Sequence, residues 1–458
     1  MTTQELLALG RLLGGSLELF AGCFSYRPSF EHFGSYARGL LSDLPRKSVE
    51  PIALACGTAV RTLQGFLRSA VWDHARVRQI YQQRLAALPR MSEPDDLGTI
   101  GLIDETSVAK KGAETPGVQR QYCGALGKQE NCIVTVHLGL VRGRFQTLVN
   151  SDLFLPESWS DDRDRCQRAD IPDHVVYRSK WRIALELLDE ARGNGLRFET
   201  LTFDEYYGGK PGFLEGLDER EQQFVAEVPK SFRVLSKRPR GARPKRGWTG
   251  KRVDQLARFS ANWHQQPWRK VSLARLTLDD QEWDVRAAQV YLLREGDLTE
   301  RTDWLIVARN QRTGETKYFI SNAPADTPLE RLLRIAFSRW NIEHTCRVAK
   351  SELGLSHFEG RSDISLIRHL TLCELLLGFV AEHTDRLRGE KSGDHSGTNP
   401  PRPEPTLPSL AQKPPHHDRP PTHLPCHPRP PTTQPRRKNL TPKNQSSLVT
   451  WRCSIKSQ

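Results

Sequence analysis

The sequence predicts an α/β fold that follows a helical N-terminal region and precedes a tail without a packed core. Three observations lead to this prediction. Apolar residues recur at helical spacing before residue 91, strand-like apolar runs bounded by turn residues follow, and the composition changes abruptly at Lys391. With 458 residues, 37% of them hydrophobic, the chain is long enough for two or three domains and a large core.

The first region, residues 1–91, is predicted to be a helical domain. Val60, Leu63 and Leu67 recur at helical spacing, and the same spacing continues through residues 77–88. Arginines decorate these helices, and DNA binding is the function that they suggest. A plain helical bundle with solvated arginines remains open, because no helix-turn-helix signature fixes how the region would dock.

Residues 97–228 are predicted to form the first part of the α/β core. They contain three strand-like runs, a helical pattern and a further strand: 99–107, 122–127, 132–150, 180–195 and 198–209. Three antiparallel strands followed by a helix and another strand are the order of an RNase H-like core.

A β-rich domain is predicted to interrupt this core. The chain between the strand at 198–209 and the helices predicted for residues 329–388 is too long for a simple strand-to-helix connection. Strand-like runs fill most of that interval: 269–278, 282–295 and 303–324. We therefore expect an inserted β-rich domain over residues 229–328.

The helices of residues 329–388 are predicted to complete the core. The segment 365–384 is the most apolar stretch of the chain, yet Arg368, His369 and Glu374 interrupt it. It is therefore predicted to be a core helix and not a membrane span.

The tail, residues 389–458, is predicted to be disordered, proline-rich and basic. From Lys391 onward it holds 15 of the 30 prolines and 11 lysines or arginines, but only 3 acids. Such a composition cannot bury enough apolar surface to form a domain. The abrupt change after a good helix also fits a reading-frame change that replaced an original C-terminus.

Charge and cysteine usage indicate a polyanionic partner and a reducing compartment. Lysines and arginines number 67 against 54 acids, which gives a formal charge of +13 and a pI near 9.4. This excess favours nucleic acid as a partner. Nine cysteines without a CxxC pair fit reduced thiols in a cytoplasm. The N-terminus lacks the basic region and the unbroken apolar run of a secretory signal.

Two aspartates follow apolar runs that are typical of buried strands. "GLID" ends at Asp104 and "LTFD" ends at Asp204, and α/β folds place their chemistry at strand ends. Each aspartate has an acidic neighbour, Glu105 or Glu205, and alternation along a strand predicts that one member of each pair faces the site. A helix cap or turn is the alternative role of an aspartate at a strand end.

The segment "RWNIEHTCRVAK", residues 339–350, combines an acid with two cations. At about 100° per residue, Arg339, Glu343 and Lys350 share one helical face. A solvated ion-pair stripe is the alternative, since acid–base pairs four residues apart stabilise many surface helices. Glu352 competes for the role of the acid, but it points about 180° away on the same helix.

Three acids from separate elements, Asp104, Asp204 and Glu343, indicate a metal site. Carboxylates that converge in this way can hold two divalent ions, which activate an attacking oxygen on a phosphodiester and stabilise the leaving one. Mg²⁺ suits such a site, because it prefers oxygen ligands and keeps waters or phosphate oxygens in its remaining positions. Mn²⁺ is the alternative ion.

These residues resemble a known family. The chain resembles the DDE transposases of bacterial insertion sequences, in the subgroup whose glutamate helix carries a Tyr-(2)-Arg-(3)-Glu-(6)-Lys signature. The resemblance covers roughly residues 30–385, and the signature falls on Arg339, Glu343 and Lys350, with "KSELGLSHFEGR" continuing it. Ala336 occupies the tyrosine position, which is a departure from the pattern and removes one expected phosphate contact.

The resemblance implies a fold, a reaction and partners. It implies an RNase H-like catalytic core interrupted by an inserted β-rich domain, in which Asp104, Asp204 and Glu343 are the catalytic, metal-binding triad. Arg339 and Lys350 would hold the phosphates of the transposon end. The implied reaction is strand cleavage at terminal inverted repeats, followed by transfer of the freed 3′ hydroxyl into target DNA. A homodimer that pairs two transposon ends is implied as well.

A basic arm at the start of the inserted region, residues 237–252, is predicted to bind DNA. It has eight basic residues in sixteen and no acid. Such an arm would contact phosphates, which gives affinity without sequence specificity, and an indole within it could stack on a base. The residues expected to make these contacts are Lys237, Arg238, Arg240, Arg243, Lys245, Arg246 and Trp248. A flexible solvated loop is the alternative.

Two rival functions remain open. One is a DNA-binding protein or regulator derived from a transposase and without cleavage activity, an interpretation favoured by the missing tyrosine and the unusual tail. The other is an RNase H-like nuclease that cuts without joining. The protein is expected in the bacterial cytoplasm, associated with the nucleoid when it is bound to DNA.

Overall fold

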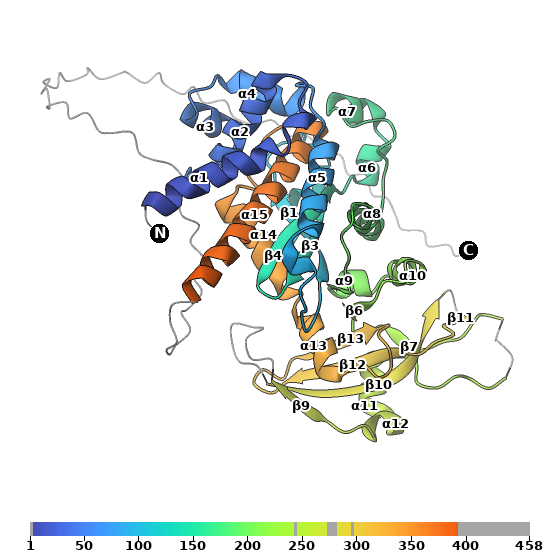
Figure 1. The fold of residues 1–458 in the computed structure, drawn as a ribbon. Coiled ribbons are helices and arrows are strands. Elements are labelled where there is room, and N and C mark those ends of the chain that lie inside the picture. Colours follow the sequence, from blue (N-terminus) through green and yellow to red (C-terminus); the bar gives the residue numbers. More distant parts are fainter. Residues whose placement is uncertain (1–2, 242–244, 273–281, 295–296, 393–458) are drawn as a thin grey trace, which may run out of the picture. The chain divides into compact units, whose positions relative to one another are not determined.

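The computed structural model describes residues 3–241, 245–272, 282–294 and 297–392 (Figure 1). The described residues belong to one compact unit, a mixed α/β fold around a mixed sheet. The predicted tail, 389–458, lies outside the described residues except for residues 389–392, which extend the last helix.

The helices predicted near the N-terminus are present. Their bounds are α1 Thr3–Glu18, η1 Ala21–Cys23, α2 Arg27–Leu41, α3 Val49–Ala55, α4 Val60–Arg68, α5 His74–Ala86 and η2 Pro89–Met91. Aromatic rings fill their core, where Phe66 stacks on Trp72 with ring centroids 5.3 Å apart. The buried guanidinium of Arg368, on the last helix, donates to the carbonyls of Leu67 and Ala70. It thereby satisfies backbone groups that the end of α4 would leave unpaired.

Four antiparallel strands begin the central sheet. Their bounds are β1 Ile100–Ala109, β2 Gln119–Cys123, β3 Lys128–Arg142 and β4 Phe145–Leu153. β3 pairs with β1 on one edge, and with β2 and then β4 on the other. Two predictions are wrong in detail: the strand expected at 132–150 is two strands joined by a turn at Gly143, which has φ 57°, and the strand expected at 122–127 ends at Cys123.

Two parallel strands extend the sheet beyond β1. β5, Thr200–Phe203, pairs with β1, and β6, Phe224–Glu227, pairs with β5. The helices around them are α6 Glu157–Ser160, α7 Arg163–Arg168, α8 Lys180–Gly193, α9 Glu205–Gly208 and α10 Pro211–Glu219. The helix predicted at 180–195 is therefore observed as α8.

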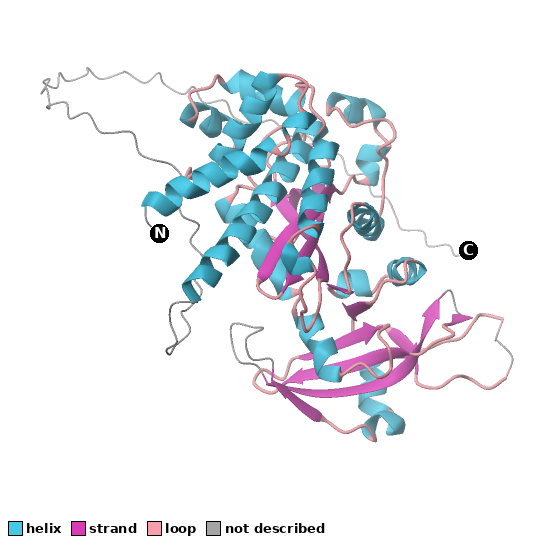
Figure 2. Ribbon diagram, viewed as in Figure 1, coloured by secondary structure: helices cyan, strands magenta, loops and turns pink. Residues whose placement is uncertain are grey.

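Residues 229–328 are rich in strands, as Figure 2 shows. The elements are β7 Arg233–Leu235, β8 Lys251–Arg252, α11 Val253–Phe259, α12 Ala261–His264, β9 Arg269–Ser272, β10 Glu282–Arg294, β11 Asp297–Leu298, β12 Asp303–Asn310 and β13 Thr316–Ser321. β13 pairs with β6, so these strands continue the central sheet along one hydrogen-bonded path. The inserted domain stays a prediction.

Three helices return the chain to the sheet. Their bounds are α13 Leu329–Phe337, α14 Trp340–Glu352 and α15 Asp363–Ser392. α14 contacts β1, β3 and β4, while α15 packs on β4 and α5. The Asp363–Thr384 part of α15 is long and apolar enough to cross a membrane, with a mean hydropathy of 1.7, but 78% of that stretch is buried within the protein. It is a core helix, as predicted.

Candidate active site

Three acidic residues lie side by side at one edge of the parallel strands. The parallel register of β1, β5 and β6 ends at three apolar residues: Ile103, Phe203 and Ala226. The next residue along the chain is in each case an acid: Asp104, Asp204 or Glu227. Because parallel strands end at the same edge of a sheet, these residues are neighbours there although they lie far apart in the sequence.

Asp104 closes the apolar run "GLID" but lies in the middle of β1, so it is not at the end of this strand, as an aspartate at a strand end would be. β1 continues to Ala109 because it pairs with β3 over its whole length, with Asp104 opposite His137. Burial and the negative charge of Asp204 raise the pKa of Asp104 to about 7, although Arg339 opposes the shift. The ionised carboxylate is therefore poorly compensated by its surroundings.

Asp204 is both a helix cap and a member of the site. Its Oδ1 accepts hydrogen bonds from the backbone N–H groups of Tyr206 and Tyr207 at 3.0 and 3.3 Å, which caps α9. Burial raises the pKa of Asp204, while these N–H groups and Arg339 lower it. Asp204 therefore does act as a helix cap, the alternative role considered for it. The cap also fixes its carboxylate at the edge of the sheet.

Arg339 connects the acid on α14 with the acids on the strands. Its Nη1 donates to Glu343 Oε1 at 2.8 Å and lies 3.8 Å from Oδ2 of Asp104. Its Nε lies 3.8 Å from Oε2 of Glu227, and its side chain is only 12% exposed. Asp104 and Glu343 therefore lie within reach of one guanidinium nitrogen. The ion pair between residues four apart exists, but it is not a solvated surface stripe.

The competing acids have other partners or positions, although Glu105 is close enough to Asp204 to help raise its pKa. Glu105 pairs with Lys180 of α8 at 2.8 Å, whereas Asp104 faces Arg339 of α14, as alternation along a strand predicts. Glu205 is exposed in the first turn of α9. Glu352 is the last residue of α14, about two and a half turns beyond the signature glutamate.

Glu227 is a site residue that the sequence analysis missed. Lys317 of β13 donates to its Oε1 at 2.7 Å, and its other oxygen faces Arg339. A local signal existed, because "FVAE" is an apolar run closed by an acid, as "GLID" and "LTFD" are. The position of β6 beside β5 depends on pairing between distant segments, which the sequence does not reveal.

The cluster offers oxygen ligands that suit a divalent metal. The residues that could hold one are Asp104, Asp204, Glu227 and Glu343. Within the ranges that the structure describes, no three His, Cys, Asp or Glu side chains converge closely enough to form a ready metal site. The guanidinium of Arg339 lies among three of these carboxylates, those of Asp104, Glu227 and Glu343.

Lys350 and Ala336 occupy the remaining signature positions. Lys350 is half-buried near the end of α14. Burial of His137 and, after it, the positive charge of Lys350 lower the pKa of His137 to about 3. Ala336 is buried, and the neighbouring Phe337 packs against Trp283 with ring centroids 4.8 Å apart. The position of the missing tyrosine is thus part of the core.

The basic arm carries exposed cations. Five of the expected contacts are exposed: Lys237, Arg238, Arg240, Lys245 and Arg246. Trp248 is half-buried, and Arg243 lies outside the described residues. The arm joins β7 to β8 and has no helix or strand in its described part before Lys251.

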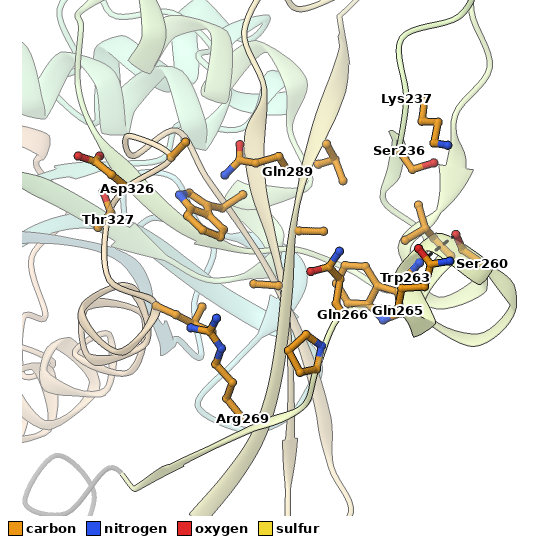
Figure 3. A pocket seen from close by; sticks show the side chains of 18 of the residues that line it. Ser236, Lys237, Ser260, Trp263, Gln265, Gln266, Arg269, Gln289, Asp326 and Thr327 are labelled. Atoms are coloured by element: carbon orange, nitrogen blue, oxygen red, sulfur yellow. Dashed lines mark hydrogen bonds between the residues drawn. The ribbon is translucent and has the colours of Figure 1, made fainter.

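A cavity of about 710 Å³ lies in the β-rich segment (Figure 3). The buried indole of Trp263, three glutamines and the side chains of Lys237 and Arg269 contribute to its lining. Asp326 is the carboxylate among the lining residues. None of the four acids at the strand edge lines this cavity, so it is separate from the candidate metal site.

Comparisons with known proteins bear on the identity of the chain. Residues 19–290, which include Asp104 and Asp204, match a family model described as DDE superfamily endonuclease. The probable transposase for insertion sequence element IS701 of Microchaete diplosiphon is 34% identical over 203 residues, which are 44% of this chain and 49% of that protein. The chain thus spans about half the length of this curated relative.

A solved structure shows a weaker similarity. The cryo-EM structure of a piggyBac transposase synaptic complex with hairpin DNA aligns over 78% of this chain and 66% of that chain. The TM-score is 0.39 and the sequence identity 10%, which is too low to establish a shared fold. The match to the family model covers more than half of the sequence, and on this basis the chain belongs to the DDE superfamily of endonucleases.

Proposed function

We propose that the chain is a DNA transposase that cleaves strands at the terminal inverted repeats of its element and transfers the freed 3′ hydroxyl into target DNA. The observation that carries this proposal is the grouping of Asp104, Asp204 and Glu343 around one guanidinium at the edge of the sheet. Membership of the DDE superfamily and the identity with a probable insertion-sequence transposase support it. Both steps would be in-line phosphoryl transfers at the same site.

The proposed domain organisation follows from this function. The parts are a helical DNA-binding region, a two-part RNase H-like core, an inserted β-rich domain and a proline-rich tail: 1–91, 97–228 with 329–388, 229–328 and 389–458. Antiparallel β1, β3 and β4, followed by α8 and the parallel strand β5, support the RNase H-like assignment.

The acid cluster fits a divalent metal, for which we propose Mg²⁺, with Mn²⁺ as the alternative. Asp104, Asp204 and Glu343 are the proposed ligands. The raised pKa values of the two aspartates support the fit: burial is the main cause of both shifts, and a bound cation would offset the cost of keeping the buried carboxylates ionised. When bound, the metal would activate the attacking oxygen and stabilise the leaving oxygen of the phosphodiester.

The chain's own residues would position the acids and the DNA. Pairing of β1 with β3 and the cap of α9 hold two of the carboxylates in place, and packing of α14 on the sheet holds the third. Arg339 and Lys350 are proposed to bind phosphates of the transposon end, for which a guanidinium is well suited because it donates two parallel hydrogen bonds. The arm at 237–252 would add affinity without sequence specificity.

The proposed partners are the terminal repeats and the target DNA, with a homodimer pairing two ends in the bacterial nucleoid. The test combines the purified chain, Mg²⁺, a duplex that ends in the element's terminal repeat and a target plasmid. Joined products support transposition, and cuts without joining would indicate an RNase H-like nuclease. A gel shift without cuts would indicate a DNA-binding protein without activity, the alternative that Ala336 at the tyrosine position favours.

A further inference from the structure

We propose that Arg339 is an internal counter-cation of the acid cluster, which competes with the divalent metal until a DNA phosphate draws the guanidinium away. We further propose that Glu227 is the positioning residue that holds Arg339 in the cluster. This inference rests on the proposed function, because it takes the cluster as the metal site. It adds a coupling between metal binding and DNA binding.

Four carboxylates from separate elements surround the guanidinium. It donates to Glu343 on its own helix and lies close to Asp104 on β1 and Glu227 on β6. These three acids and Asp204 raise the pKa of Arg339, although burial opposes the shift. The arginine is therefore held in the cluster as a fixed positive charge.

The contacts of Arg339 use oxygen atoms that a metal would need. Its Nη1 lies 2.8 Å from Glu343 Oε1 and 3.8 Å from Asp104 Oδ2. Mg²⁺ requires oxygen ligands at about 2.0–2.1 Å, so an ion between these two carboxylates would occupy the space of the guanidinium. Two cations at so short a distance would also repel each other. Occupancy by Arg339 and occupancy by the metal are therefore mutually exclusive.

Glu227 provides Arg339 with a partner outside the proposed metal ligands. Its Oε2 lies 3.8 Å from Arg339 Nε, while its Oε1 accepts a hydrogen bond from Lys317 Nζ at 2.7 Å. β6 itself is held on both sides, by β5 and β13. The Glu227 side chain is thus fixed at the edge of the cluster, where it favours the resting position of the arginine.

A DNA phosphate offers the guanidinium a matched alternative partner. The planar fork of an arginine binds phosphate through two hydrogen bonds. Arg339 is the N-cap residue of α14, and its long side chain can turn by rotation about its own bonds, which leaves the helix unchanged. When the guanidinium leaves, less positive charge remains near the carboxylates, so they would bind a metal more tightly. By thermodynamic linkage, metal would strengthen DNA binding by the same factor.

Titration of the full-length chain with Mn²⁺, followed by electron paramagnetic resonance of the free ion, tests this coupling. Without DNA, Arg339→Gln should bind Mn²⁺ more tightly than the unmodified protein by about five- to a hundredfold, the usual range of such couplings. A terminal-repeat duplex should tighten Mn²⁺ binding by the unmodified protein but change it little in the variant. Arg347→Gln is the matched control, because Arg347 is exposed on the same helix. It should behave as the unmodified protein does.

A second variant separates the role of Glu227 from that of a metal ligand. Glu227→Gln should tighten Mn²⁺ binding without DNA, because it loosens Arg339, whereas weaker binding would make Glu227 a ligand and overturn its positioning role. Mn²⁺ binding by Arg339→Gln that is no tighter than that of the control overturns the competition. Thermal melts check folding, and if Arg339→Gln does not fold, Glu227→Gln decides the outcome.

Asp104→Asn distinguishes failure of this inference from failure of the proposed function. If that variant binds Mn²⁺ as the unmodified protein does, the cluster is not the metal site and both proposals fall. If it loses Mn²⁺ while Arg339→Gln gains nothing, only the competition by Arg339 is refuted.

Discussion

Two clusters of acids and basic residues in this chain differ in their balance of charge. The matched cluster, which ties α10 to the β-rich strands, contains two acids, two arginines and an amide: Asp218, Asp303, Arg294, Arg301 and Asn322. The acid-rich cluster at the strand edge contains four acids around one arginine, with a lysine on one side: Asp104, Asp204, Glu227, Glu343, Arg339 and Lys317.

The two clusters differ in how many cations accompany the acids. In the matched cluster, Arg301 contacts Asp218 and lies 3.3 Å from Asp303, so each acid has an arginine partner. In the acid-rich cluster, the carboxylates outnumber the cations, and the pKa of Asp104 rises to about 7, first through burial. Burial also raises the pKa of Asp303 in the matched cluster, to about 6, so the two clusters differ in the number of cations per acid and not in whether burial raises a pKa.

The largest effect is expected where the acid-rich cluster loses a proposed metal ligand. Asp104→Asn should reduce strand cleavage by about 10³-fold or more, because bound metal contributes several kcal/mol to stabilisation of the transition state. Gel shifts should show nearly unchanged DNA binding. Glu105→Gln is the matched control, since Glu105 pairs with Lys180 outside the cluster. If Glu105→Gln loses cleavage and Asp104→Asn does not, Glu105 and not Asp104 is the first acid of the triad.

The same substitution should change the free energy of unfolding in opposite directions in the two clusters. Asp218→Asn removes the carboxylate that Arg294 and Arg301 share, leaving Arg301 with Asp303, and should lower it by about 2 kcal/mol. Asp104→Asn removes a charge that its surroundings disfavour, and should raise it by about 1 kcal/mol near pH 8 without divalent metal. Urea unfolding in the presence of a chelator measures both values. Changes of the same sign would contradict the comparison.

Glu374 is a third kind of buried acid, one that is neutral in the folded protein because it keeps its proton. Burial raises its pKa from the ordinary value of 4.5 to about 8, although Ser151 and Arg78 oppose the shift. The folded protein therefore keeps a proton that the unfolded chain has released, and stability falls as pH rises from about 4.5 to about 8.

The contribution of Glu374 has an upper limit of about 1.4 kcal/mol per pH unit, the value for one proton. Urea unfolding at several pH values in this window should give a flatter dependence for Glu374→Gln than for the unmodified protein. Other buried acids, such as Asp363 with a pKa of about 7, will leave a residual slope. Parallel curves for the two proteins would exclude Glu374 as a source of the pH dependence.

The smallest effect concerns the basic arm, whose sequence contains no acid. The double variant Lys237→Ala with Arg238→Ala should weaken binding to all DNA sequences about equally. It should also reduce the slope of log affinity against log salt concentration by about 2, one for each lost phosphate contact. Fluorescence anisotropy at several salt concentrations measures the slope. Lys128→Ala, which removes a cation paired with Glu130, is the control. An unchanged slope in the double variant would remove these residues from the DNA contact.

Local patterns predicted the acids better than they predicted the strands around them. "GLID" and "LTFD" identified Asp104 and Asp204 because an acid after an apolar run is a short-range signal. The turn at Gly143 was missed because β3 is buried from Cys132 to its end and β4 is also mostly buried, so neither strand alternates. A continuous apolar run does not show where a strand ends.

Glu227 shows the limit of such patterns. Its place in the cluster depends on the parallel register of β5 with β6 and on the antiparallel pairing of β6 with β13. Both pairings join segments that are distant in sequence, and their register is set by packing across the sheet. The grouping of Arg339 with Glu343 was predictable, since residues four apart share a helical face. Its contact with Glu227 was not.

β6 is shared between the acid cluster and the β-rich segment, and this has a mechanical consequence. Glu227 at the end of β6 is paired with Phe319 of β13, in the same ladder that carries β12 and β10. The proposed DNA-binding arm follows β7, and β7 pairs with β10. An unbroken ladder of backbone hydrogen bonds through β10, β12, β13 and β6 therefore connects the base of that arm to Glu227.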